Sequence, residues 1–215
     1  MNKERKIRLG IIGTSAGNGH PYSWASIING YDDNYLDDCP YPAIIKYLRA
    51  NDHFVNKIKN VEITHIWTQD IEVSKEIANI AFIPNIEKNY IDLIKKVDGI
   101  LLARDDFENH LSMSMPFLKA SIPIYIDKPI ATNLKTLNNI FKEQKYKGQI
   151  FSCSALKYAK EFNLGDDYLS NFGSLKKVIA IAPKDWLHYS VHIIEPVLKI
   201  FKLYKNFNSI FVKEY

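Results

Sequence analysis

The segment Ile122-Pro-Ile-Tyr-Ile-Asp-Lys-Pro-Ile130 decides the fold, because it joins a short apolar strand to an abrupt polar end. Apolar residues occupy every second position up to Ile126, and Pro129 cannot continue a strand because it lacks an N–H donor. Open α/β sheets bind ligands beyond the carboxyl ends of their strands. We therefore expect Lys128 at a ligand crevice, with a solvated turn lysine as the alternative.

The composition is that of an ordinary globular protein: 215 residues, 47% apolar and 24% charged, with a net charge of +4. This length suits one large domain or one and a half, and the charge is too small to indicate nucleic-acid binding. Cys39 and Cys153 lie far apart, which favours a reducing compartment. The first apolar run is too short for a signal peptide, and none reaches the roughly 20 residues that span a bilayer. We expect a cytoplasmic protein without nucleic-acid or membrane partners.

The N-terminal segment combines a strand, a glycine-rich turn and a helix. Residues 7–12 are the expected strand, and it enters Gly13-Thr-Ser-Ala-Gly-Asn-Gly19. This order is typical of the phosphate-binding start of a dinucleotide fold, with Gly13, Thr14 and Ser15 as candidate cofactor contacts. Ser15 and Asn18 occupy the second and third glycine positions of G-x-G-x-x-G. The motif is therefore weak, and a plain glycine-rich loop remains an alternative.

Strands and amphipathic helices alternate through the next 140 residues or so, which predicts right-handed crossovers and a Rossmann-type doubly wound parallel sheet. Residues 31–59 are more than one βαβ unit needs, so we expect an insertion. After Lys157 the pattern changes, and we expect domains at 1–155 and 156–215, the second an incomplete α+β domain. The expected strands are 61–67, 81–83, 97–103, 149–155 and 174–182, and the expected helices are 44–48, 71–78, 90–97, 107–118, 134–141 and 186–196.

The second expected strand ends at Thr68-Gln-Asp70. In dinucleotide folds a carboxylate at this place normally binds the adenosine ribose hydroxyls. Here Thr68 holds the first position and Asp70 follows two residues later. Both are candidate cofactor contacts.

Five motifs follow one another along the chain: the Gly13 loop, Val97-Asp98 at the start of a strand, Asn109-His110, Asp127-Lys128-Pro129, and His188-x-x-x-His192. This order resembles the glucose–fructose oxidoreductase/inositol dehydrogenase (Gfo/Idh/MocA) family, and the Asp-Lys-Pro turn is similar to the family's Glu-Lys-Pro. The resemblance implies NAD or NADP as the cofactor. It also implies hydride transfer at a ring carbon of a sugar, cyclitol or related substrate.

The resemblance also implies roles for particular residues. Lys128 matches the lysine between nicotinamide and substrate, with Asp127 beside it on the cofactor side, and His192 matches the catalytic histidine. His188 stands where the family has an Asp, and Glu195 matches a later acid. An imidazole suits a proton acceptor near neutral pH, and an ammonium stabilises a developing alkoxide.

The helical spacing of His188, His192 and Glu195 puts them on one face. Such a face also permits a metal site or two hydrogen-bonded structural histidines, but we expect no metal. His188 in place of Asp removes the anion that would support His192. Thr68 weakens the preference for NAD, and Arg104 or Lys75 could neutralise a 2′-phosphate.

The family continues into a large antiparallel sheet after the point where this sequence ends. We expect either a partner that covers the partial sheet, with a homo-oligomer possible through the second domain, or a truncated piece of a longer enzyme. The alternative function is a non-catalytic dinucleotide- or sugar-sensing module that acts through a partner.

Overall fold

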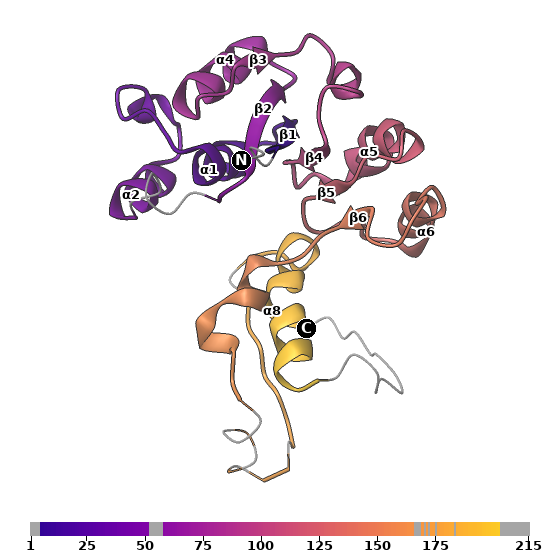
Figure 1. The fold of residues 1–215 in the computed structure, drawn as a ribbon. Coiled ribbons are helices and arrows are strands. Elements are labelled where there is room, and N and C mark those ends of the chain that lie inside the picture. The colour runs from indigo at the N-terminus through magenta and orange to yellow at the C-terminus, as the bar shows by residue number, and fades with distance from the viewer. Residues whose placement is uncertain are drawn as a thin grey trace. The chain divides into compact units, whose positions relative to one another are not determined.

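The computed structural model describes residues 5–51, 58–165, 169, 171, 173–174, 176–182 and 184–202 (Figure 1). The chain divides into two compact units, Met1–Ser152 and Cys153–Tyr215. Among the described residues, no helix is both long and apolar enough to cross a membrane.

A six-stranded sheet of order β3-β2-β1-β4-β5-β6 forms the centre of the first unit, and every neighbouring pair is parallel. The strand order reverses between β1 and β4, which creates a switch point at the carboxyl ends of these two strands. The predicted doubly wound Rossmann sheet is thus confirmed. The strands are β1 Ile7–Ile12, β2 Val61–Trp67, β3 Asn85–Ile86, β4 Gly99–Leu102, β5 Ile124–Ile126 and β6 Ile150–Phe151.

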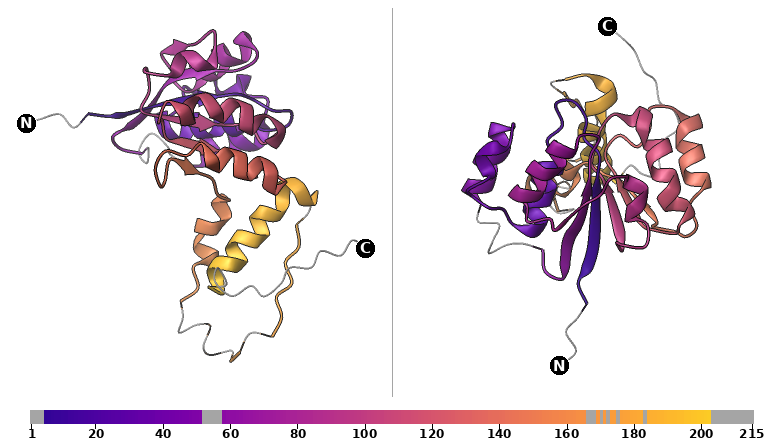
Figure 2. Two further views of the ribbon diagram at one scale, coloured as in Figure 1. Left: turned by 90° about the vertical axis from the view of Figure 1, so that its right-hand side faces the viewer. Right: turned by 90° about the horizontal axis from the view of Figure 1, so that it is seen from above.

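Helices cover both faces of this sheet (Figure 2). Ile11 belongs to a core shared with α1 and α4, while the next residue, Ile12, belongs to a core shared with α5 and α6. Successive strand residues point to opposite faces, so β1 supplies both cores. The helices of this unit are α1 His20–Asn29, α2 Pro42–Ala50, α4 Ile71–Ile80, α5 His110–Lys119 and α6 Leu134–Lys142, with short 3₁₀ turns at Leu36–Asp38, Tyr90–Leu93 and Phe107–Asn109.

Two expected elements of the first unit are wrong. Residues 81–83 form a turn rather than a strand, because Phe82 adopts φ +52° and lies 49% exposed, and β3 begins only at Asn85. The helix expected over residues 90–97 is a single 3₁₀ turn, Tyr90–Leu93. Lys95 at φ +74° is incompatible with a continuing helix.

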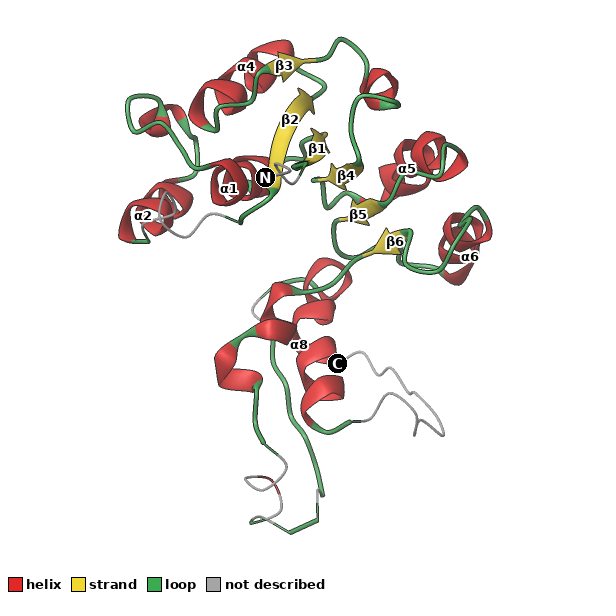
Figure 3. Cartoon of the chain, viewed as in Figure 1, coloured by secondary structure: helices red, strands yellow, loops and turns green. Residues whose placement is uncertain are grey.

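The described part of the second unit contains one α-helix, short 3₁₀ turns and coil (Figure 3). The expected helix is confirmed as α8, Trp186–Ile200, and two 3₁₀ turns, Ala155–Tyr158 and Lys160–Phe162, precede it. The strand expected over residues 174–182 is wrong for the residues described there. Ile179 and Ile181 are 72% and 83% exposed and no strand pairs with them, and an isolated strand has no ladder to stabilise it. The expected sheet segment 207–215 lies outside the described residues.

Candidate functional site

The glycine loop leaves β1 at a position that only glycine fits well. Gly13 adopts φ +82°, and its N–H donates to the carbonyl of Trp67 at 2.8 Å. A Cβ at this position would lie 2.7 Å from Cδ of Arg104. The first glycine of the weak motif is therefore required by both backbone conformation and space.

Gln69 ties this loop to the end of β2. Its Oε1 accepts from the N–H of Thr14 at 3.0 Å, and its Nε2 donates to the Thr14 carbonyl at 2.7 Å. The side-chain amide thus pairs with one residue of the loop backbone in both directions. Sequence reasoning missed Gln69 because it looked for a carboxylate at this strand end.

A cavity of about 440 Å³ lies beyond the carboxyl ends of the central strands. Ligand pockets of this size are common at the switch point of α/β sheets. Two of its lining residues belong to the expected insertion, so residues 31–59 contribute to the site. The lining residues are Thr14, Ser15, Ala16, Gly17, Tyr22, Pro40, Tyr41, Gln69, Val73, Arg104 and Asp106.

Thr68 and Asp70 do not line this cavity. The Thr68 hydroxyl donates to the Asp70 carbonyl at 2.5 Å and contacts Oγ of Ser74 at 2.8 Å. The Asp70 carboxylate caps α4 by accepting the N–H of Glu72 at 2.9 Å. Both side chains thus stabilise the β2–α4 turn.

Arg104 lines the cavity with its charge already balanced. Its guanidinium makes a two-point ion pair with Asp106, and Nη1 contacts Sδ of Met113 at 3.5 Å. Burial acts to raise the pKa of Asp106, but the Arg104 hydrogen bond and charge outweigh it, so that this pKa lies below its usual value. Lys75, the other expected neutraliser of a 2′-phosphate, pairs with Glu72 on the exposed face of α4.

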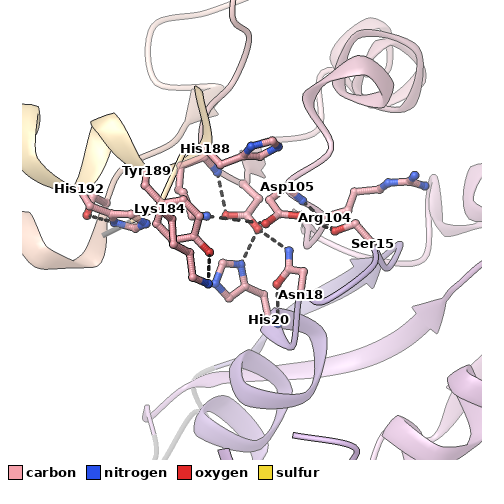
Figure 4. Close-up of polar contacts among 12 residues, drawn as sticks. Ser15, Asn18, His20, Arg104, Asp105, Lys184, His188, Tyr189 and His192 are labelled. Atoms are coloured by element: carbon pink, nitrogen blue, oxygen red, sulfur yellow. Dashed lines mark hydrogen bonds and ion pairs between the residues drawn. The ribbon is translucent and has the colours of Figure 1, made fainter. Parts of the chain in front are cut away.

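Lys128 lies at the carboxyl end of β5 with only 6% of its surface exposed, which does not fit a solvated turn lysine. Its Nζ is 3.9 Å from Oδ2 of Asp105. Oδ1 of Asp105 accepts a hydrogen bond from Ser15 Oγ at 2.6 Å (Figure 4). The Lys128–Pro129 peptide is cis. Ser15, Asp105 and Lys128 therefore bring the ends of β1, β4 and β5 together through polar contacts.

Asp127 is completely buried beside this lysine. Oδ2 accepts from Asn18 Nδ2 at 3.1 Å and lies 2.5 Å from His20 Nδ1, and Oδ1 accepts the N–H of Lys128 at 2.7 Å. Burial acts to raise the pKa of Asp127, but the His20 hydrogen bond and the nearby positive charge outweigh it, so that this pKa is lowered. Sequence reasoning did not select His20, although a histidine at the first helical position after the glycine loop is a signal in the sequence.

The second unit holds the other expected catalytic residues. His192 Nδ1 lies 2.7 Å from the hydroxyl of Ser154, and a Glu195 oxygen accepts the Ser154 N–H at 2.5 Å. His188 Nδ1 lies 2.8 Å from Asp185, which also caps α8 by accepting the N–H of His188. His192 and Glu195 therefore share one partner, while His188 has another. Among the residues described, no group of three or more His, Cys, Asp or Glu side chains could hold a metal ion.

The sheet, the glycine loop and the cavity define the class: a nucleotide-binding α/β protein with its site at the switch point. Residues 42–154 match the Gfo/Idh/MocA model, described as an oxidoreductase family with an NAD-binding Rossmann fold. The chain belongs to this family. Its positive-φ Gly13 and the cavity beside the loop fit such a cofactor, so the prediction of NAD or NADP is confirmed.

Solved structures share the fold at low sequence identity. A myo-inositol dehydrogenase from Lactobacillus casei, solved with NAD(H) and myo-inositol, is 14% identical with a TM-score of 0.53 over 73% of this chain and 39% of that one. A Gfo/Idh/MocA family oxidoreductase from Vibrio cholerae is 14% identical with a TM-score of 0.51 over 74% and 42%. A myo-inositol 2-dehydrogenase from Lactobacillus plantarum is 16% identical with a TM-score of 0.48 over 74% and 39%. The chain thus spans about two fifths of the length of these proteins, and no curated protein matches its sequence.

Proposed function

We propose that this chain acts in an NAD(P)-dependent oxidoreductase that transfers hydride between nicotinamide and a ring carbon of a sugar, cyclitol or related substrate. The observation that carries the proposal is the placement of Lys128. It is a buried ammonium at the carboxyl end of β5, next to the β1–β4 switch point, with the carboxylate of Asp105 at 3.9 Å. An ammonium held in this way can stabilise an alkoxide as charge develops on the substrate oxygen.

The residues of the glycine loop would hold the dinucleotide. Thr14 and Ser15 line the cavity, Gln69 fixes the loop backbone, and Arg104 forms part of the wall with its charge paired to Asp106. Backbone N–H groups at such a loop bind phosphate without a charged side chain. When bound, the cofactor supplies the hydride acceptor or donor.

The second unit would supply further contacts to substrate hydroxyl groups through His192 and His188. An imidazole can accept the proton of the hydroxyl group that is oxidised. We further propose that residues 156–215 contribute to substrate binding and to a homo-oligomer. Cys39 and Cys153 are buried and are not joined in a disulfide, which supports a reducing, cytoplasmic compartment.

A second candidate function is a non-catalytic module that senses a dinucleotide or sugar. The observation that favours it is His188 at the place of the family Asp, with its Nδ1 2.8 Å from Asp185, because an imidazole does not supply the anion that the family Asp would. Such a module would bind the dinucleotide and transfer no hydride.

Titration with NADH and NADPH, followed by cofactor fluorescence, combined with turnover of a panel of sugars and cyclitols, tests the proposal. Lys128→Met should lower kcat by ~10² or more while the cofactor still binds. Lys135→Met is the matched control, because Lys135 is an exposed lysine on α6. Cofactor binding without turnover of any substrate would favour the sensor, and wild-type kcat in Lys128→Met would remove this lysine from the mechanism.

A further inference from the structure

The insertion contributes an aromatic side chain to the cavity beside the glycine loop. Tyr41 directly precedes α2, and it lines this cavity together with its neighbour Pro40. Helix α1 supplies Tyr22 to the same cavity, and the two tyrosine rings meet edge-on with their centroids 5.6 Å apart. Tyr41 is thus a candidate ligand contact that none of the five sequence motifs includes.

The backbone at Tyr41 is restricted by the sequence Cys39-Pro-Tyr-Pro42. A residue before proline is confined to extended conformations, and Tyr41 adopts φ −119° and ψ 90°. Pro42 is the first residue of α2, where a missing N–H costs no helical hydrogen bond. The tyrosine side chain is therefore attached to a stiff segment of chain.

Packing anchors the described part of the insertion to α1 and α4, and α2 lies beside α1 (Figure 1). The N–H of Asp32 donates to the carbonyl of Ile80, the last residue of α4, at 2.8 Å. The hydroxyl of Tyr22 donates to Glu76, also on α4, at 2.6 Å. Three side chains of the insertion lie in the buried core that these helices share: Leu36, Cys39 and Leu48.

The glycine loop makes room for the tyrosine at Gly19. This residue has φ −91°, so its backbone conformation does not require glycine. A Cβ at this position would lie 3.0 Å from two ring atoms of Tyr41 and 2.4 Å from Cδ1 of Ile44. The lack of a side chain at Gly19 therefore lets the insertion approach the loop closely.

The position of the cavity indicates which half of a dinucleotide lies beside Tyr41. In Rossmann folds the first glycine turn binds the pyrophosphate, and the adenosine ribose lies at the end of the second strand. Ser15 of the glycine loop lines the cavity, as do Gln69 and Val73, which follow β2. Lys128, at the proposed nicotinamide end, is not among the described residues that line it. The cavity therefore corresponds to the adenosine half.

We propose that the ring of Tyr41 forms a wall against the adenosine half of NAD or NADP, which rests on the cofactor site of the proposed function. A planar aromatic ring offers a purine a surface on which to stack. Burial raises the pKa of the Tyr41 phenol, so this wall is uncharged at neutral pH. Because the segment is stiff, little conformational freedom is lost when the cofactor binds.

Calorimetric titrations with NADH and with ADP-ribose test this contact without turnover. ADP-ribose contains the adenosine half and lacks the nicotinamide. Tyr41→Ala should weaken the binding of both ligands by the same factor, ~10-fold or more, whereas Tyr41→Phe should bind both as the wild type does. Tyr35→Ala is the matched control, because Tyr35 is a 43% exposed tyrosine of the same insertion and does not line the cavity.

A measurement on the wild-type chain does not depend on the folding of the alanine variant. With ¹³C-labelled tyrosine, the ring signals of Tyr41 are assigned by their loss in Tyr41→Phe. Saturating ADP-ribose should shift these signals and give nuclear Overhauser effects between the Tyr41 ring and the protons of the adenosine. Unshifted ring signals without such effects would overturn the assignment.

The outcomes separate this assignment from the proposed function. Wild-type affinity of Tyr41→Ala for ADP-ribose, or an equal loss of affinity in Tyr41→Phe, would refute the ring contact and leave the oxidoreductase proposal standing. A loss for NADH alone would place Tyr41 at the nicotinamide half and refute the assignment as well. Cofactor binding that depends on Tyr41, without turnover of any substrate, would refute hydride transfer and leave the Tyr41 contact standing.

Discussion

Replacement of Gly13 by alanine tests whether the glycine loop is shaped by packing as well as by backbone conformation. Gly13 (φ +82°) and Gly17 (φ +74°) both have left-handed backbones, but only at Gly13 would a Cβ meet another atom, Cδ of Arg104 at 2.7 Å. At Gly17 no heavy atom lies within 4 Å of an added Cβ. Gly17→Ala is therefore the matched control for backbone strain alone.

The expected cost has two parts. A left-handed conformation costs an L-residue about 1–2 kcal/mol, which applies to both variants. Arg104 cannot move away freely because Asp106 holds its guanidinium, so Gly13→Ala adds an overpacking cost of about 1–3 kcal/mol. The free energy of unfolding should fall by about 1–2 kcal/mol in Gly17→Ala and about 2–5 kcal/mol in Gly13→Ala.

Urea denaturation followed by tryptophan fluorescence measures these differences. Of the three tryptophans, only Trp186 lies in the second unit, and it is 55% exposed. A Trp186→Phe background therefore makes the signal specific to the unit that contains the loop. In a double-mutant cycle, Arg104→Ala should recover about 1–3 kcal/mol of the Gly13→Ala loss. Equal losses in the two glycine variants, or no coupling to Arg104, would refute the packing argument.

Three further predictions concern single contacts. The pKa of Asp98 is lowered, mainly by its hydrogen bonds with Arg8. Asp98 therefore contributes stability that is complete above pH ~4 and is lost as the pH falls through its folded pKa. The denaturation midpoints of wild type and Asp98→Asn should accordingly converge in acid. Tyr22→Phe removes a 2.6 Å hydrogen bond to Glu76 and should lower the free energy of unfolding by about 1 kcal/mol, whereas an unchanged urea midpoint would contradict that contact. Gln69→Ala removes both hydrogen bonds to the backbone of Thr14. It should weaken NADH binding about threefold to tenfold in a fluorescence titration, which corresponds to about 0.5–1.5 kcal/mol. An unaltered affinity would show that the loop keeps its shape without the amide.

The two units carry different parts of the proposed chemistry. The first unit contains the cavity beside the glycine loop, the buried Lys128 and the contact between His20 and Asp127. In the second unit, His192 contacts Ser154 and His188 contacts the capping residue Asp185.

The class of fold could be predicted from local patterns in the sequence. Strands β1 and β2 and helices α4 and α8 follow from the spacing of apolar residues, because burial on one face requires a regular period. The Asp-Lys-Pro turn is predicted to lie at a ligand crevice because Pro129 prevents the strand from continuing, and ligands bind beyond the carboxyl ends of such strands. Both are properties of short stretches of chain.

The tertiary structure decided which polar groups meet, because those contacts join residues that are distant in sequence. Asp127 and His20 are 107 residues apart, and only the order of β1, β4 and β5 brings them within 2.5 Å. The place of Thr68 after β2 predicts a cofactor contact, but its hydroxyl contacts the Asp70 carbonyl and Oγ of Ser74. The side chain that contacts the glycine loop is that of the next residue, Gln69. A sequence period determines which face of an element is buried, but only the packed sheet determines which side chains from separate strands share a hydrogen bond.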